Sequence, residues 1–256
     1  MPALNVSAIP AFSDNYIWLI RTAGTKCAVV DPGDARPVQE TLSQSGLDLR
    51  YILLTHHHPD HVGGMSELRR QTGATVFGPD DRRIRDVDRI VREGEVAHLP
   101  ELGLDFEVLE VPGHTASHIV FFGHGSLFCG DTLFSVGCGR LFEGTPEQMQ
   151  SSLDKLAALP SDTQVYCGHE YTLANCQFAL EVEPDNERLK MKAEAVEALR
   201  AQGQITLPGR LGEELEVNPF LRSRAESVVR AAQKRDPGAA PGAPTLAVIR
   251  QWKDRW

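Results

Sequence analysis

Residues 55–61 read Thr-His-His-His-Pro-Asp-His and directly follow the apolar run Tyr51–Leu54. The stretch sets three imidazoles and one carboxylate in the pattern His-x-His-x-Asp-His at the end of what reads as a buried strand. Such groups repel one another when charged and are costly to desolvate when buried. A bound divalent cation relieves both costs, and imidazole with carboxylate suits zinc, iron or manganese. The stretch therefore predicts a metal site at a strand end.

One histidine of this run is expected not to bind metal. In an extended segment, alternate side chains point to opposite faces. His56 and His58 therefore share one face, while His57 points to the other. We predict that His57 is not a ligand.

Three further ligand-type residues stand directly after a glycine at the end of an apolar run. They are His114, Asp131 and His169. Glycine permits a sharp turn that directs the next side chain over the strand end, and loops at strand ends commonly carry chemistry. Cys129 and Cys167 lie two residues before Asp131 and His169. Thiolate ligands at these two positions are the alternative to small buried packing residues.

The pattern His-x-His-x-Asp-His, followed by Gly-His-Thr, Gly-Asp and Gly-His, resembles the metallo-β-lactamase superfamily. Within it, the chain resembles the hydroxyacylglutathione hydrolases, also called glyoxalase II. The first pattern is specific only to the superfamily, whereas the last three of the matching segments are more specific to glyoxalase II. The segments extend over nearly the whole chain and are Ala11–Tyr16, Pro112–Thr115, Leu141–Thr145, Cys167–Thr172, Asn218–Arg222 and Arg250–Asp254.

The order of sequence patterns favours a layered α/β fold, because strands with one face packed and helices outside form layers. The resemblance implies the four-layer αββα metallo-β-lactamase sandwich. Strands are expected at 3–9, 15–22, 26–31, 51–55, 75–78, 104–111, 118–123, 126–129 and 163–167, and helices at 37–45, 61–72 and 146–158.

The chain changes character after about residue 172. Residues 173–182, 186–201, 222–234 and 245–255 read as helices, and no strong strand is expected among them. We therefore expect a metallo-β-lactamase-like catalytic domain at 1–172 and a helical C-terminal substrate-binding domain at 173–256. With 256 residues and 41% hydrophobic side chains, the chain is long enough to form both.

Composition restricts the location of the protein. The sequence contains no apolar stretch near the roughly 18 residues of a membrane span. Its first residues lack the basic segment and apolar block of a secretory signal. The five cysteines are odd in number and form no Cys-x-x-Cys pair, which favours reduced thiols. We expect a cytoplasmic protein without membrane association.

Charge restricts the partners. The formal net charge of −9 argues against nucleic acid as a partner. Residues 1–186 carry 13 basic and 26 acidic side chains, whereas residues 187–256 carry 13 and 9. The net basic C-terminal region suits a small anionic ligand, the alternative being a random distribution over a solvated surface. No obvious apolar surface stripe is present, so we expect a monomer.

The resemblance implies a site with two divalent metal ions, expected to be Zn²⁺, with iron or manganese as alternatives. Two such ions lower the pKa of a shared water from 15.7 towards about 7. The resulting metal-bound hydroxide attacks a carbonyl without a serine or cysteine nucleophile. Asp60 and Asp131 are the expected catalytic carboxylates. The implied ligands are His56, His58 and His114 for the first metal, Asp60, His61 and His169 for the second, and Asp131 for both.

The resemblance names the substrate as S-D-lactoylglutathione, which is converted to D-lactate and glutathione in methylglyoxal detoxification. A thioester suits this chemistry because its thiolate leaves without strong acid assistance. By family correspondence, Arg250 and Lys253 bind the glycine carboxylate of glutathione, although an exposed helix face is the alternative interpretation. Arg140 stands where the family often has lysine, and Tyr171 hydrogen-bonds the peptide. Phe142 stands where some members carry tyrosine, so one hydroxyl contact is absent.

Two more residues and three other functions remain open. Asp31 and His118 either orient a ligand imidazole or serve in turns and packing. A β-lactamase or lactonase of the same fold leaves the C-terminal basic residues without a task. A glutathione persulfide dioxygenase uses one iron on two histidines and one aspartate, fewer than the seven ligands here. A non-catalytic protein with structural zinc favours thiolate-rich coordination.

Overall fold

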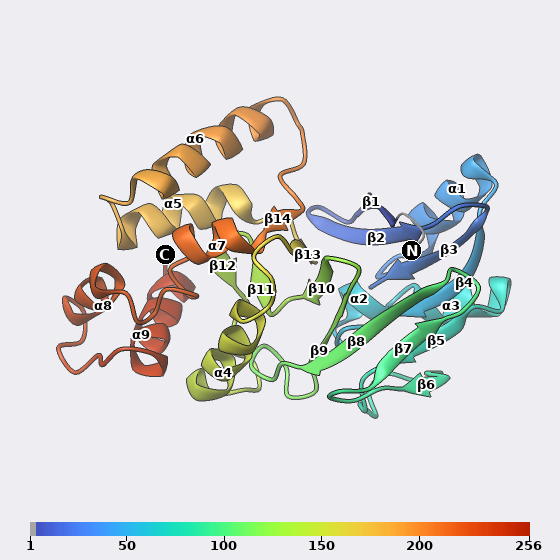
Figure 1. The fold of residues 1–256 in the computed structure, drawn as a ribbon, viewed down its shortest axis with the longest axis horizontal. Helices are drawn as coiled ribbons and strands as arrows, with labels where there is room; N and C mark the ends of the chain where they lie inside the picture. The colour runs from blue at the N-terminus through green and yellow to red at the C-terminus, as the bar shows by residue number, and fades with distance from the viewer. Residues whose placement is uncertain (1–3) are drawn as a thin grey trace. The chain divides into compact units, whose positions relative to one another are not determined.

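The computed structural model describes residues 4–256, which form two compact units (Figure 1). The first unit contains the chain up to Glu110 together with Ser117–Gly130. The second contains Val111–Ala116 and Asp131–Trp256. The domain boundary expected after residue 172 stays a prediction. Within the described part of the chain, no helix combines the length and apolar content that crossing a bilayer requires.

A mixed six-stranded sheet lies in the first unit, with its strands in the order of the chain. The pairs from β1 to β3 are antiparallel, and those from β3 to β6 are parallel. Parallel neighbours end at the same sheet edge, so the segments that follow β3 and β4 start side by side. The strands are β1 (Asn5–Ala11), β2 (Asn15–Arg21), β3 (Lys26–Val30), β4 (Asp48–Leu53), β5 (Thr75–Gly78) and β6 (Arg89–Ile90).

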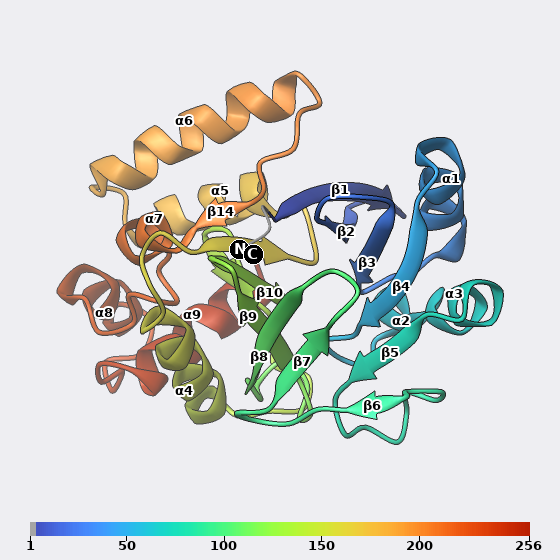
Figure 2. The same ribbon diagram turned by 45° about the vertical axis from the view of Figure 1, so that its right-hand side comes forward.

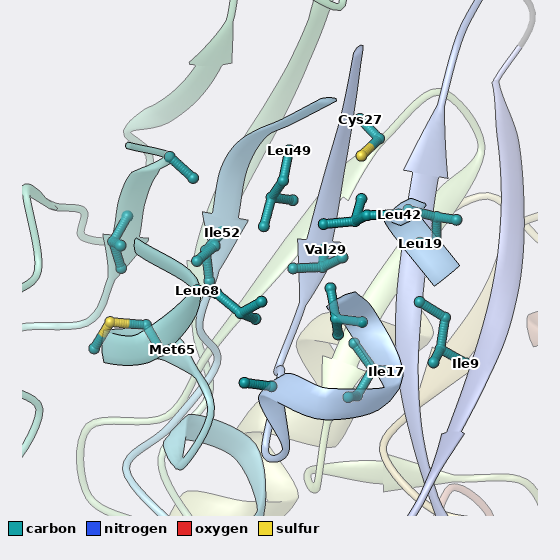
Figure 3. Close-up of a cluster of buried hydrophobic side chains, with 14 of the residues drawn as sticks. Ile9, Ile17, Leu19, Cys27, Val29, Leu42, Leu49, Ile52, Met65 and Leu68 are labelled. Atoms are coloured by element: carbon teal, nitrogen blue, oxygen red, sulfur yellow. The ribbon is translucent and has the colours of Figure 1, made fainter. Parts of the chain in front are cut away.

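Helices α1 (Ala35–Ser45) and α3 (Met65–Thr72) cover one face of this sheet (Figure 2). Leu42 and Leu68 from the helices share a buried cluster with Val29 and Ile52 from the strands (Figure 3). Burying each such aliphatic side chain contributes about 1.5–3 kcal/mol. This core fixes the strands whose ends lead into the histidine-rich run.

Four antiparallel strands of a second sheet also belong to the first unit, in the order β10-β9-β8-β7 (green in Figure 2). Along β8, buried and exposed residues alternate from Leu104 to Val108, as in a sheet with one face against a core. The strands are β7 (Val96–Leu99), β8 (Leu104–Glu110), β9 (Ile119–Gly123) and β10 (Ser126–Gly130).

The second unit is mainly helical. Its two short antiparallel pairs are β11 (Leu133–Phe134) with β12 (Gly137–Cys138), and β13 (Gln164–Cys167) with β14 (Gly209–Arg210). A capping box at Thr145 starts the first helix. Three helices, α5 to α7, share a small apolar core. The helices are α4 (Pro146–Ala157), α5 (Thr172–Val182), α6 (Glu187–Ala201), α7 (Leu211–Val217), α8 (Glu226–Gln233) and α9 (Ala243–Asp254).

Most expected elements are present, with two corrections. The single helix expected at 61–72 is wrong: α2 (Pro59–Val62) and α3 are separated at Gly63 and Gly64. Backbone approaches closely there, since a Cβ on Gly64 would lie 2.4 Å from the Ala35 nitrogen. The helix expected at 222–234 begins only at Glu226. The short strands β6, β7, β11, β12 and β14 and the helix α7 have no clear signal in the sequence.

Candidate metal centre and adjoining pocket

The histidine-rich run leads from the end of β4 through a loop into α2. His56 and His61 are buried, whereas His58 and Asp60 are partly exposed. His56 Nε2 lies 3.1 Å from His58 Nδ1. Two ligand nitrogens about 2.1 Å from a tetrahedral zinc lie about 3.4 Å apart. The close pair of imidazole nitrogens therefore fits joint binding of one cation.

Asp31 fixes this loop from the end of the neighbouring strand β3. Its carboxylate accepts hydrogen bonds from the Thr55 backbone N–H at 2.8 Å and from the Thr55 hydroxyl at 2.6 Å. The same carboxylate lies 3.0 Å from His61 Nδ1. A proton held on Nδ1 leaves His61 Nε2 with a lone pair, 3.5 Å from Asp60 Oδ2. These are the contacts that an orienting role for Asp31 requires.

Two more histidines of the first unit, one inside the run and one outside it, are not among the predicted ligands. His57 directs its Nδ1 towards Asp81, at 3.5 Å from the carboxylate. The His118 ring is fully buried and stacks on His56, with centroids 4.6 Å apart and planes 15° apart. His118 Nδ1 lies 3.0 Å from the Ile119 carbonyl oxygen. His118 thus packs on the His56 ring, while His57 contacts a different carboxylate.

Asn15 was not identified from the sequence. Its side-chain amide donates to Asp60 Oδ2 at 3.0 Å, and the residue is buried at the start of β2. An amide is not a typical ligand of these metals, so a search for ligand-type residues passes over it. Only its position in the segment shared with the family marks it.

The second unit brings together the other three predicted ligands, all of them buried. The Nε2 atoms of His114 and His169 lie 3.5 and 3.4 Å from the same oxygen, Oδ2 of Asp131. This spacing again matches that of donors around one ion. His114 Nδ1 lies 2.9 Å from the Arg140 carbonyl oxygen, which orients the ring. The donor chemistry and spacing within each unit therefore fit a divalent cation.

Glycines shape the backbone beside these ligands. Gly113 and Gly130 take positive φ angles of 156° and 47°, directly before His114 and Asp131. A Cβ on Gly139 would lie 2.0 Å from the Asp131 carbonyl oxygen. The turns predicted from glycine are therefore present at these two ligands.

Cys167 has the contacts of a packing residue. Its thiol donates to the His169 carbonyl oxygen at 3.6 Å. Burial raises the pKa of the Cys167 thiol to about 12, so the neutral thiol is favoured over the thiolate that binds metal. Cys129 is also fully buried, within β10.

A cavity of about 490 Å³ in the second unit joins metal-type donors to basic side chains. His114 and Asp131 line it, and so do Arg140, Arg250 and Lys253. Tyr171 and Phe142 also line the cavity, and they contact the metal-type histidines. The Tyr171 ring stacks on the His169 ring with their centroids 4.7 Å apart, and the Phe142 ring meets the His114 ring edge-on with centroids 5.3 Å apart.

Arg250 is a buried side chain of this cavity. One guanidinium nitrogen donates to the Cys138 carbonyl oxygen at 2.8 Å, and another lies 3.1 Å from Asp254. The guanidinium also lies over the Phe220 ring, 5.2 Å from its centroid. Its Nε has no hydrogen-bond partner among residues 4–256. The guanidinium therefore keeps one buried donor that no described residue satisfies.

Lys253 lies one helical turn further along α9. Its ammonium donates to Asn175 Oδ1 and lies 5.5 Å from the Phe178 ring centroid. Burial, followed by the positive charge of Arg250, lowers the pKa of Lys253 to about 7. An anion bound beside both cations would favour the protonated lysine.

Known proteins resemble this chain over its full length. Residues 11–169 match the metallo-beta-lactamase superfamily, and residues 170–256 match the hydroxyacylglutathione hydrolase C-terminus. A hydroxyacylglutathione hydrolase of Pseudomonas fluorescens is 51% identical, over 99% of this chain and 100% of its own. Another hydroxyacylglutathione hydrolase, from Albidiferax ferrireducens, is 52% identical over 97% of this chain and 98% of its own.

Solved structures share the fold. ETHE1 from Myxococcus xanthus superposes with a TM-score of 0.66 at 25% identity, over 98% of both chains. The BLEG-1 B3 metallo-beta-lactamase superposes with a TM-score of 0.64 at 20% identity, over 86% of this chain and 99% of its own.

The fold and the histidine–aspartate donors together define a protein of the metallo-β-lactamase superfamily, and the expected fold class is confirmed. The more specific matches extend through the helical C-terminal region. By these matches, the chain belongs to the hydroxyacylglutathione hydrolases and is an enzyme. The resemblance inferred from the sequence is therefore confirmed, in preference to the β-lactamase, lactonase, dioxygenase and structural-zinc alternatives.

Proposed function

We propose that the enzyme hydrolyses S-D-lactoylglutathione to D-lactate and glutathione, as a step of methylglyoxal detoxification. The observation that carries this proposal is the cavity of the second unit. Arg250 and Lys253, which we propose bind a carboxylate, line it together with the metal-type donors His114 and Asp131. The names of the full-length relatives support the same substrate class.

The proposed cofactors are two divalent metal ions. Zinc is the first choice, and iron or manganese also accept these donors. The donor spacings within each unit, 3.1 Å in the first and 3.4–3.5 Å in the second, support this proposal. The proposed ligands are His56, His58 and His114 for one ion, Asp60, His61 and His169 for the other, and Asp131 for both.

When bound, the ions would supply an activated water and polarise the thioester carbonyl. Neighbouring residues orient the metal-type donors through hydrogen bonds. Asp31 holds a proton on His61 Nδ1, and the Arg140 carbonyl oxygen does the same for His114. Asp60 is held by Asn15 and, in the proposal, also accepts a proton as water attacks. Glutathione leaves as a thiolate, so no strong general acid is needed.

The glutathione half of the substrate is proposed to bind along the basic side of the cavity. Arg250 and Lys253 line the cavity, and each is proposed to form a charge-assisted hydrogen bond with the glycine carboxylate. The Arg140 side chain is 62% exposed, and its Nε lies 3.5 Å from Asp254 Oδ1. Its terminal N–H groups are therefore proposed to bind the ligand. Tyr171 is exposed and is proposed to hydrogen-bond the peptide.

The remaining proposals concern the form of the protein. Residues 1–172 would be the catalytic domain and 173–256 the substrate-binding domain. All five cysteines are free and buried, which suits the reducing cytoplasm. We propose a cytoplasmic monomer without nucleic-acid or membrane partners.

Paired kinetic measurements test the substrate assignment. Replacing both Arg250 and Lys253 by alanine should raise KM for S-D-lactoylglutathione by roughly two to four orders of magnitude, because each charge-assisted bond contributes about 1.5–3 kcal/mol. The kcat should fall much less, the pattern of lost uniform binding. Alanine at the exposed Lys234 and Arg255 is the matched control.

A thioester that lacks the glycine carboxylate should not respond to the double change. Strong chelation should abolish hydrolysis, and added divalent metal should restore it. Full activity in metal-free protein, or an unaltered KM in the double variant, would count against the proposal.

A further inference from the structure

The turn between β11 and β12 has a backbone that its sequence does not favour. Leu133 pairs with Cys138 and Phe134 with Gly137, so Ser135 and Val136 form a two-residue turn. Val136 has a φ of +56°. Glycine, asparagine or aspartate usually takes such positions, and a β-branched residue there is a genuine outlier. Strain of this kind persists only where the surroundings hold it in place.

Buried polar side chains from outside the turn supply that hold. The Glu214 carboxylate accepts from the Ser135 hydroxyl and from the Val136 backbone N–H, both at 2.7 Å. Asn218 donates to the carbonyl oxygens of Phe134 at 3.1 Å and Gly137 at 3.0 Å. Glu214 and Asn218 are four residues apart at α7, and both are fully buried.

Burial raises the pKa of the Glu214 carboxyl, and the hydrogen bonds from the turn oppose that rise. The group is therefore costly to bury without these partners. An apolar residue of similar size would fill the same volume at this position. The carboxylate is better explained by what it holds than by packing.

The hairpin that contains this turn also contacts the basic side chains of the cavity. The Cys138 carbonyl oxygen, at the end of β12, accepts the hydrogen bond from Arg250. Asn175 donates to the Ser135 carbonyl oxygen at 2.9 Å and accepts from Lys253. Arg250 thus bonds to the strand β12 that follows the Glu214-held turn, and Lys253 is connected to Ser135 of the turn through Asn175.

We propose that Glu214 is a positioning residue for thioester hydrolysis: it holds the Ser135–Val136 turn in shape, and the turn holds Arg250 and Lys253 where they bind the glutathione half of the substrate. This inference rests on the proposed function of that pair. Glu214 itself touches neither the substrate nor the metal-type donors in this account. Its loss should therefore change binding rather than chemistry.

Three substitutions test this role. Glu214→Leu keeps the volume but removes both acceptors, and should raise KM for S-D-lactoylglutathione roughly 10- to 100-fold with kcat within about threefold. Glu214→Gln should return KM to within about fivefold of wild type, because an amide can still accept from the Val136 N–H. Glu216→Leu is the matched control, since Glu216 lies on the same helix with a side chain 55% exposed.

Two further readouts separate positioning from a purely structural role. Metal content should be equal in all variants, and a thioester without the glycine carboxylate should show no change in KM. If Glu214→Leu does not fold, Ser135→Ala removes one of the two bonds to the turn and should raise KM roughly two- to tenfold.

The outcomes distinguish this inference from the proposed function. If Arg250→Ala raises KM but the folded Glu214→Leu and Ser135→Ala variants do not, the positioning role is overturned and the clamp stands. If Glu214→Leu lowers kcat and metal content with the same KM, its role is structural only. If Arg250→Ala itself leaves KM unchanged, the proposed substrate-binding pair is wrong.

Discussion

The affinity for a glutathione thioester should depend on pH through Lys253. The lysine pKa is lowered to about 7, first by burial and then by the neighbouring charge of Arg250. Lys253 is therefore protonated below about pH 7 and increasingly neutral above it. A protonated lysine forms a charge-assisted bond with a carboxylate, whereas a neutral amine forms an ordinary one. KM should therefore be lowest below pH 7 and should rise above it.

The size of the effect follows from the two kinds of hydrogen bond. A bond to a charged group contributes about 1.5–3 kcal/mol and a neutral one about 0.5–1.5 kcal/mol. The difference of roughly 1–1.5 kcal/mol corresponds to about a five- to tenfold rise in KM. The bound carboxylate itself favours protonation, so the rise should be complete only well above pH 7, near about pH 9.

Initial rates of S-D-lactoylglutathione hydrolysis between pH 6 and 9 would measure this dependence, with KM and kcat determined separately. Lys253→Arg is the decisive comparison, because a guanidinium stays charged throughout this range. Its KM should be nearly constant with pH. A wild-type KM that does not change over this range, or a Lys253→Arg variant that keeps the wild-type slope, would refute the reasoning.

Two other substitutions have clear expected results. Asp131→Ala should lower the metal content per chain much more than His57→Ala, because two imidazoles converge on Asp131 whereas His57 faces Asp81; equal losses by elemental analysis would show that the alternation argument misassigns the histidine run. Thr145→Ala removes the cap of α4 and should lower the free energy of unfolding by about 0.5–2 kcal/mol in denaturant titrations, with kcat unchanged; no loss of stability would mean that the cap is dispensable.

Much of the candidate site could be read from local sequence. His56, His58, Asp60 and His61 lie within six positions, and the strand before them is a plain apolar run. The glycines before His114 and Asp131 mark turns that the structure contains. Motif spacing carries this information because strand alternation and glycine turns are properties of neighbouring residues.

Other features of the site depend on contacts between residues that are far apart in the chain. Asn15 meets Asp60 across 45 positions, and Glu214 meets Val136 across 78. No local pattern reports such pairs. The division of the expected helix 61–72 also depends on a distant contact. The backbone of Ala35 lies so close to Gly64 that a Cβ there would clash with it.

The sequence by itself therefore determined the kinds of metal donors, the strands and turns that carry many of them, and the family. The tertiary structure alone decided which polar groups hold those donors and the basic pair in place. The physical reason is that a side chain's type is set locally, whereas its hydrogen-bond partners, burial and pKa depend on what the fold packs around it. Lys253 shows the difference, because an ordinary lysine in the sequence has its pKa lowered to about 7 only where the fold buries it beside Arg250.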